Sequence, residues 1–93
     1  MRASLVDGGL LEVFKYVTVS ADGTLHLKKY RYHWQDAGGN LVRRWDTAAH
    51  HRYLPHAPHH VHLSESNIEG VAKPPDVSAV IALVEAHVRV KDL

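Results

Sequence analysis

An Asp-Gly turn between two β-rich segments is the feature that most constrains this fold. Residues 10–19 and 24–35 are rich in β-branched and aromatic side chains, which are typical of strands. Asp22-Gly23 lies between them and favours a tight hairpin turn. A second turn, at residues 36–40, precedes a third strand over residues 41–46. The sequence therefore predicts an antiparallel β-meander.

The end of the chain predicts a helix that covers this sheet. Residues 47–58 contain two prolines and no clear period, so they predict a loop, and residues 59–63 predict a short fourth strand. Asp76 is a good cap for a helix from Asp76 to Val90. Its apolar stripe has helical spacing and consists of Val77, Val80, Ile81, Val84 and Val88. We therefore expect one α+β domain over residues 1–93, an antiparallel meander of three to four strands with the C-terminal helix packed on one face.

Alternation along the strands predicts which side chains share a face. If residues 36–40 form a five-residue loop, Gln35 pairs with Leu41 and regular pairing continues from there. His60 and His62 then point together, opposite to Val61. One face of the meander is expected to hold Tyr30, Tyr32, Trp34, Val42, Arg44 and Asp46, and the other Lys29, Arg31, His33, Arg43 and Trp45.

Composition narrows the class of protein. The chain has no cysteine, which excludes disulfides and thiolate chemistry and fits a reducing cytoplasm. No apolar run approaches the roughly 20 residues that span a bilayer. The formal net charge is only +1, but the middle of the chain is basic and aromatic. Such a block is a plausible surface for phosphate.

Six of the nine histidines lie between His50 and His62. Neutral imidazole is both a proton acceptor and a common metal ligand. In His60-Val61-His62 the two rings are expected on one strand face, about 7 Å apart. They suit acid–base catalysis, or a divalent metal such as zinc with a third ligand from His50, His51 or Asp46. The plainer interpretation, a solvated or internally satisfied pair of histidines, fits the same spacing.

Two further groups of side chains are ambiguous on the sequence alone. Arg43-Arg44, next to Asp46, suits an anion clamp because planar guanidinium matches phosphate, while the same residues also fit an Arg44–Asp46 ion pair that orders the sheet. The two roles are compatible. The aromatic residues Tyr30, Tyr32, Trp34 and Trp45 could stack on bases, but alternating aromatics are more often core.

The chain resembles a known family at four segments. These are Tyr32-His33-Trp34-Gln35-Asp36, Arg44-Trp45-Asp46, His50-His51 and Pro58-His59-His60-Val61-His62. In order and spacing they are similar to the TumE-type toxins of type II toxin–antitoxin modules. The resemblance runs from about Leu10 to the final helix. Family members often carry more sequence before the first strand than this chain does.

Two positions depart from the family pattern. Thr47 stands where asparagine is usual, and Ala49 where proline is usual. The expectation is that this copy is attenuated if either residue is needed for activity.

The resemblance implies a toxin blocked by a cognate antitoxin, expected to be a helix-turn-helix protein. It does not imply a mechanism. RNA cleavage is an analogy with other small α+β toxins. A chain of this length would also gain stability as a homodimer.

Three functions compete at this stage. The first is a metal-independent endoribonuclease with His60, His62, Arg44 and Asp46 as catalytic groups, no cofactor, and RNA contacts from Tyr32, His33, Arg43, His50 and His51. The second is a metal-dependent hydrolase that holds its ion with His60, His62 and His50. The third is a non-catalytic module that binds a partner protein or nucleic acid.

Overall fold

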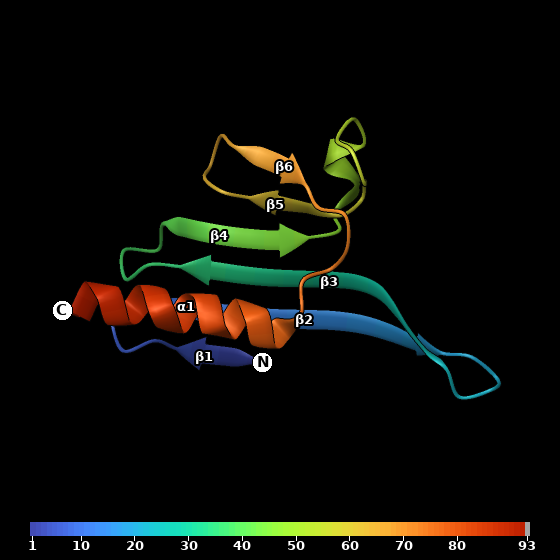
Figure 1. Ribbon diagram of the computed structural model, residues 1–93, viewed down its shortest axis with the longest axis horizontal. Helices are drawn as coiled ribbons and strands as arrows, with labels where there is room; N and C mark the ends of the chain where they lie inside the picture. The colour runs from blue at the N-terminus through green and yellow to red at the C-terminus, as the bar shows by residue number, and fades with distance from the viewer. Residues whose placement is uncertain (93) are drawn as a thin grey trace.

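The sheet is a single antiparallel meander in chain order. The computed structural model describes residues 1–92, and their side chains as far as Val88. Six strands pair in sequence, with the short 3₁₀ turn η1 (Ala49–His51) between the fourth and fifth, and the helix α1 (Val77–Asp92) follows the last (Figure 1). The strands are β1 (Arg2–Ser4), β2 (Leu10–Val19), β3 (Leu25–Gln35), β4 (Leu41–Asp46), β5 (His60–His62) and β6 (Ile68–Gly70).

The α+β class and the meander are confirmed, but the predicted number of strands is too low. The sheet has six strands, because β1 and β6 were not foreseen. Each has three residues, too few for alternation to be visible in the sequence. Both lie at the edges of the sheet, where β1 pairs with β2 and β6 pairs with β5.

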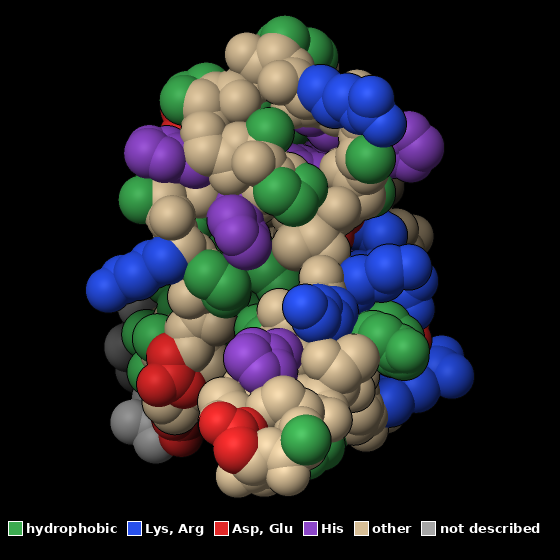
Figure 2. Space-filling model, turned by 90° about the vertical axis from the view of Figure 1, so that its right-hand side faces the viewer, with side chains coloured by type: hydrophobic (Ala, Val, Ile, Leu, Met, Phe, Trp, Pro, Cys, Tyr) green, Lys and Arg blue, Asp and Glu red, His purple; other side chains and the backbone are tan. Residues whose placement is uncertain are grey.

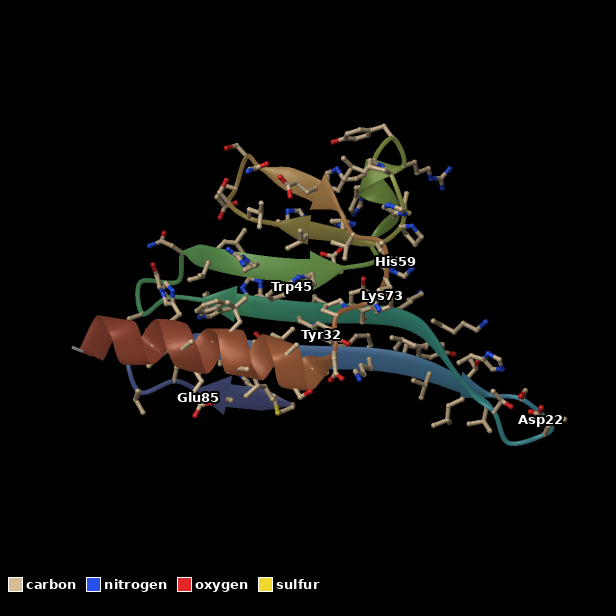
Figure 3. The ribbon with its side chains drawn as sticks, viewed as in Figure 1. Asp22, Tyr32, Trp45, His59, Lys73 and Glu85 are labelled. Atoms are coloured by element: carbon tan, nitrogen blue, oxygen red, sulfur yellow. The ribbon has the colours of Figure 1, made fainter. Side chains whose placement is uncertain are left out.

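The helix begins where its cap predicts. Asp76 Oδ1 accepts hydrogen bonds from the backbone N–H of Ser78 at 2.9 Å and from its hydroxyl at 2.8 Å. In the described part of the chain, no helix is long and apolar enough to cross a membrane. The predicted stripe is largely confirmed, although Ile81 stays 41% exposed. The core that the helix closes contains Leu11, Tyr30, Tyr32, Trp34, Trp45, Val61, Val80, Val84 and Val88, and Figure 3 labels two of these, Tyr32 and Trp45.

A β-bulge reverses the predicted facing of β4. Gln35 pairs with Leu41 as expected, but Trp34 pairs with Arg43, so Val42 is an extra residue. Beyond the bulge every side chain of β4 changes face. The predicted grouping of Arg44 and Asp46 with Tyr32 is therefore wrong. Trp45 joins the aromatic core, and Arg44 and Asp46 lie on the opposite face.

The β2–β3 hairpin extends beyond the rest of the sheet. Figure 1 shows it projecting past the start of α1, and Figure 3 places Asp22 at its tip. The projecting part of this hairpin is called the arm. It contains a second irregularity, where Tyr16 pairs with Lys29 but Val17 pairs with Leu27. Among the described residues, no strand pairs with either side of this arm beyond the Arg31–Asp46 pair. The arm therefore leaves apolar and aromatic side chains exposed, namely Tyr16, Val17, Val19, Leu25 and Leu27.

Candidate active site

A polar hollow of about 310 Å³ opens on the face of the sheet away from the helix. Its walls come from β3, β4, β5, the residues after β4 and the turn after β5. The residues that line it are His33, Leu41, Arg44, Asp46, Ala48, His50, His51, His60, His62 and Glu65. A larger hollow between β1 and α1 is mostly apolar. Of these two hollows, the smaller one therefore contains the charged and imidazole side chains that chemistry would need.

The register of three strands brings the charged and imidazole groups together. Arg44 pairs with His62, and Asp46 pairs with His60. Directly opposed residues of antiparallel strands share a face, so the bulge in β4 is what places Arg44 and Asp46 beside the two histidines. The same pairing puts Val61 opposite Trp45 on the core side.

Asp46 is the centre of this arrangement. Its Oδ2 accepts a hydrogen bond from Arg44 Nε at 2.8 Å, and its Oδ1 accepts one from the backbone N–H of Ala48 at 2.9 Å. Burial alone would raise the pKa of Asp46. The bonds from Arg44 and Ala48, together with the nearby His60, outweigh burial, so the pKa of this carboxyl lies below its usual value. Asp46 is therefore ionised at neutral pH.

His60 is the most deeply placed imidazole. It is 2% exposed, and its Nδ1 lies 2.9 Å from the carbonyl oxygen of Pro58, to which it can only donate. Its Nε2 lies 2.7 Å from Asp46 Oδ1. That approach has the distance of an ion pair but not the direction of a hydrogen bond, and Nε2 has no other partner among the described residues. Nδ1 therefore anchors the ring in the floor of the hollow, with Nε2 beside the Asp46 carboxylate.

His62 and His51 stand at the accessible side of the same cluster. The side chain of His62 is 21% exposed, and its Nε2 lies 3.9 Å from Asp46 Oδ2. The ring of His51 lies 5.6 Å from that of His62 and 5.0 Å from that of His60. Burial lowers the pKa of His62, aided by His60, His51 and Arg44, and the opposing effect of Asp46 does not cancel this. His62 is therefore a neutral proton acceptor at neutral pH.

The same histidines have the donor set of a metal site. One ligand nitrogen from each of His51, His60 and His62 lies within 4.8 Å of the other two. Three imidazoles suit zinc, with a fourth position left for water. The third member is His51, one of the three alternatives that the sequence offered, and not His50. The side chain of His50 is exposed at the rim, with its ring 6.4 Å from that of His51.

Two of the predicted RNA-contacting residues do not reach the hollow. Tyr32 has no exposed surface because it packs in the core under the helix. Arg43 pairs with Trp34 and so points to the helix side of the sheet. Both differences follow from the bulge and from the demand of the helix stripe for an aromatic surface. His33 does line the hollow, and its Nε2 lies 3.0 Å from Gln35 Oε1.

The loop before β5 contributes His50 and His51 to the wall, as the sequence predicted, but its path was not foreseen. It folds back on the sheet so closely that Gly70 meets the backbone of Pro55, with no room there for a Cβ atom. This close approach brings η1 and its histidines over β5. Glu65, after β5, also lines the hollow and was not predicted. The glycine at position 70 was the available signal for the close approach.

Replacing Asp46 by asparagine is expected to destabilise the fold by about 1.5–3 kcal/mol, the range for hydrogen bonds to charged groups. The pKa of Asp46 is lowered in the folded state. Its contribution is therefore fully present above the unfolded pKa, near 3.9, and is lost as the pH falls through the folded pKa. Urea unfolding at neutral and at acid pH measures this, and the gap between the two proteins should shrink below about pH 4. A gap independent of pH would contradict the proposed contacts.

The sequence of this chain was compared with family models, with curated proteins and with solved structures. The family model described as Toxin TumE matches residues 1–91. No curated protein and no solved structure shows a significant match. The family match covers both the whole described sheet and nearly all of the helix. The chain therefore belongs to the TumE toxin family.

Proposed function

We propose that this protein acts as an endoribonuclease whose histidines cleave RNA by acid–base chemistry. The observation that carries the proposal is the convergence of three imidazole rings on one open hollow, beside an Arg–Asp pair. Cleavage of this type needs a proton acceptor, a proton donor and a cation for the phosphate. All three kinds of group line the hollow.

His62 is the proposed general base. It is neutral and partly exposed, and it would take the proton of a ribose 2′-hydroxyl while that oxygen attacks the adjacent phosphorus. His51, whose ring lies 5.6 Å from that of His62, would donate a proton to the 5′-oxygen as the P–O5′ bond breaks. The products are a 2′,3′-cyclic phosphate and a 5′-hydroxyl, so protons and bonds balance.

Arg44 is the proposed phosphate-binding group. Asp46 holds it through Nε, and 34% of its side chain is exposed. The fork geometry of guanidinium suits two phosphate oxygens. Asp46 and His60 line the hollow but are only 4% and 2% exposed, so we propose that they position Arg44 and the more exposed histidines. His60 thus has a supporting role in place of the direct one predicted from the sequence.

The test uses purified protein and a pool of single-stranded RNA with random sequence, which removes the question of specificity. We expect fragments that end in 2′,3′-cyclic phosphate, formed equally in the presence of EDTA. A DNA pool should stay intact because it lacks the attacking hydroxyl. The proposal would be refuted if the RNA pool stays intact although expression of the same protein arrests growth in cells.

A metal-dependent hydrolase is the second candidate, and the close approach of His51, His60 and His62 favours it. These three residues would hold a zinc ion, which would supply an activated water. Metal analysis of protein purified without a nickel column separates the candidates. Stoichiometric zinc and activity lost in EDTA would favour the hydrolase.

Membership of a toxin family also suggests an antitoxin partner. We propose that this partner is a helix-turn-helix protein and that the toxin forms a homodimer when free. Co-expression with the adjacent gene, followed by measurement of the mass of the free and bound toxin in solution, tests both points.

A further inference from the structure

A second hollow of about 350 Å³ adjoins the candidate site on the same face of the sheet. Phe14, Lys29 and Arg31 line it, and it shares Arg44, Asp46 and Ala48 with the first hollow. It therefore continues the candidate site toward the projecting β2–β3 hairpin. None of Phe14, Lys29 and Arg31 has a role in the chemistry proposed above.

The strand register explains this continuity. Phe14 pairs with Arg31, Arg31 with Asp46, and Asp46 with His60, so one cross-strand row leads from the arm to the site. Tyr16 and Lys29 form the next row along the arm, about 7 Å away by the strand rise. Directly opposed side chains share a face. Each row thus offers one aromatic ring and one cation on the face of the histidines.

These side chains are exposed to solvent, and Arg31 contacts the ring of Phe14. Phe14 is 50% exposed and Tyr16 is 52% exposed, well above what a core role would allow. The guanidinium carbon of Arg31 lies 5.7 Å from the centre of the Phe14 ring, in a cation–π contact. Figure 2 shows Lys and Arg side chains gathered at the right of the view, beside exposed hydrophobic groups. Among the described residues that line this hollow, Asp46 is the one carboxylate, and it is already paired with Arg44.

Exposed rings that alternate with cations are the chemistry of single-strand recognition. Unpaired bases stack on aromatic side chains, and Lys or Arg follows the phosphates. A double helix hides its base faces and would leave the two rings without a partner. We propose that Phe14, Tyr16, Lys29 and Arg31 form a docking track that holds single-stranded RNA and leads it to Arg44 and the histidines. This inference rests on the proposed ribonuclease function, because it assigns the substrate of the same site.

The test measures binding apart from cleavage. The probe is a short single-stranded 2′-O-methyl RNA of mixed sequence, which has no attacking hydroxyl. Its binding is measured by fluorescence anisotropy over a salt series. Lys29→Gln with Arg31→Gln should weaken binding at least tenfold and reduce the salt slope by about two. Phe14→Leu and Tyr16→Leu should each weaken binding about 5- to 100-fold. Phe14→Tyr, which keeps an aromatic ring at this position, should bind like the natural chain.

Lys15→Gln is the matched control. Lys15 lies on β2 between the two rings but pairs with Tyr30, on the helix face, so its loss should leave binding nearly unchanged. Equal losses for Lys15→Gln and for the track variants would overturn the proposal. So would binding that falls with salt but ignores both rings, or that favours duplex RNA. Self-association that Phe14→Leu abolishes would assign the track to a second copy, and would likewise overturn it.

The two proposals fail separately. Tight, track-dependent binding of the methylated probe without cleavage of the matching unmodified RNA would remove the ribonuclease and keep the track. Cleavage that the track variants leave unchanged would remove the track and keep the ribonuclease.

Discussion

His62→Ala is expected to relieve the growth arrest caused by this protein when it is expressed without an antitoxin. A positioned acid or base contributes about 10²- to 10⁴-fold to rate. The side chain of His62 is 21% exposed and its Nε2 lies 3.9 Å from Asp46 Oδ2, so its loss should cost little stability. The measurement is colony formation under induction, with the protein level checked by immunoblot.

His56→Asn is the control for this experiment. His56 is exposed in the same His-rich loop, and its φ of 64° suits asparagine better than alanine. This variant should remain toxic. Arg44→Lys should lose toxicity, because lysine keeps the charge but not the planar fork. Arrest that persists in the double variant His60→Ala, His62→Ala would remove the catalytic interpretation and favour sequestration of a partner.

The purified protein offers a second readout of the same residue. The pKa of His62 lies below its usual value of 6.5 because of burial, aided by His60, His51 and Arg44. The neutral base therefore persists into mildly acid solution, and the cleavage rate should fall only below about pH 6.5. His62→Ala should remove this acid limb. An unchanged limb would assign the base to another group.

The natural departures from the family pattern affect how the growth test is designed. Thr47 Oγ1 accepts a hydrogen bond from the backbone N–H of Tyr30 at 3.3 Å, and Ala49 begins η1. Both positions therefore shape the wall that carries His51. If the natural chain is too weak to arrest growth, Thr47→Asn with Ala49→Pro provides the reference, and the His62→Ala comparison is made in that background.

The sequence predicted the elements of this fold better than their facing. The three long strands and the helix cap followed from turn residues and periodicity, because those signals are local. The bulge at Val42 is not local. It is set by the packing of Trp45 into the core beside Tyr32, and a single extra residue reverses every side chain of β4 after it. The strand register, rather than composition, therefore places Arg44 and Asp46 with the histidines.

The site was predictable as a set of residues but not as a set of roles. The grouping of His60 and His62 followed from alternation over one strand. The burial of His60 and the selection of His51 among the three possible third ligands depend on how the loop after β4 folds back on the sheet, while Glu65 enters the wall from the turn after β5. That path is fixed by the close approach of Pro55 to Gly70, a contact between distant segments that no periodic pattern reports.

Val84→Asp is expected to destabilise the protein by at least about 3–5 kcal/mol. Val84 is 3% exposed in the core formed by the helix and the aromatic face of the sheet. The change removes apolar contacts and buries a carboxylate among residues that offer it no partner. Domains of this size have only about 5–15 kcal/mol of stability in total, so most of the cooperative transition should be lost.

Leu83→Asp is the matched control for Val84→Asp. Leu83 is the preceding residue of the same helix and is 39% exposed, so the same new charge is introduced into the same helix but remains in water. Circular dichroism during heating should show a melting temperature close to that of the natural chain for Leu83→Asp and a large fall for Val84→Asp. Equal melting temperatures for the two variants would mean that α1 is not docked on the sheet. The aromatic face would then be open, and the hollow on the opposite face would lose the rigid sheet that holds its histidines in place.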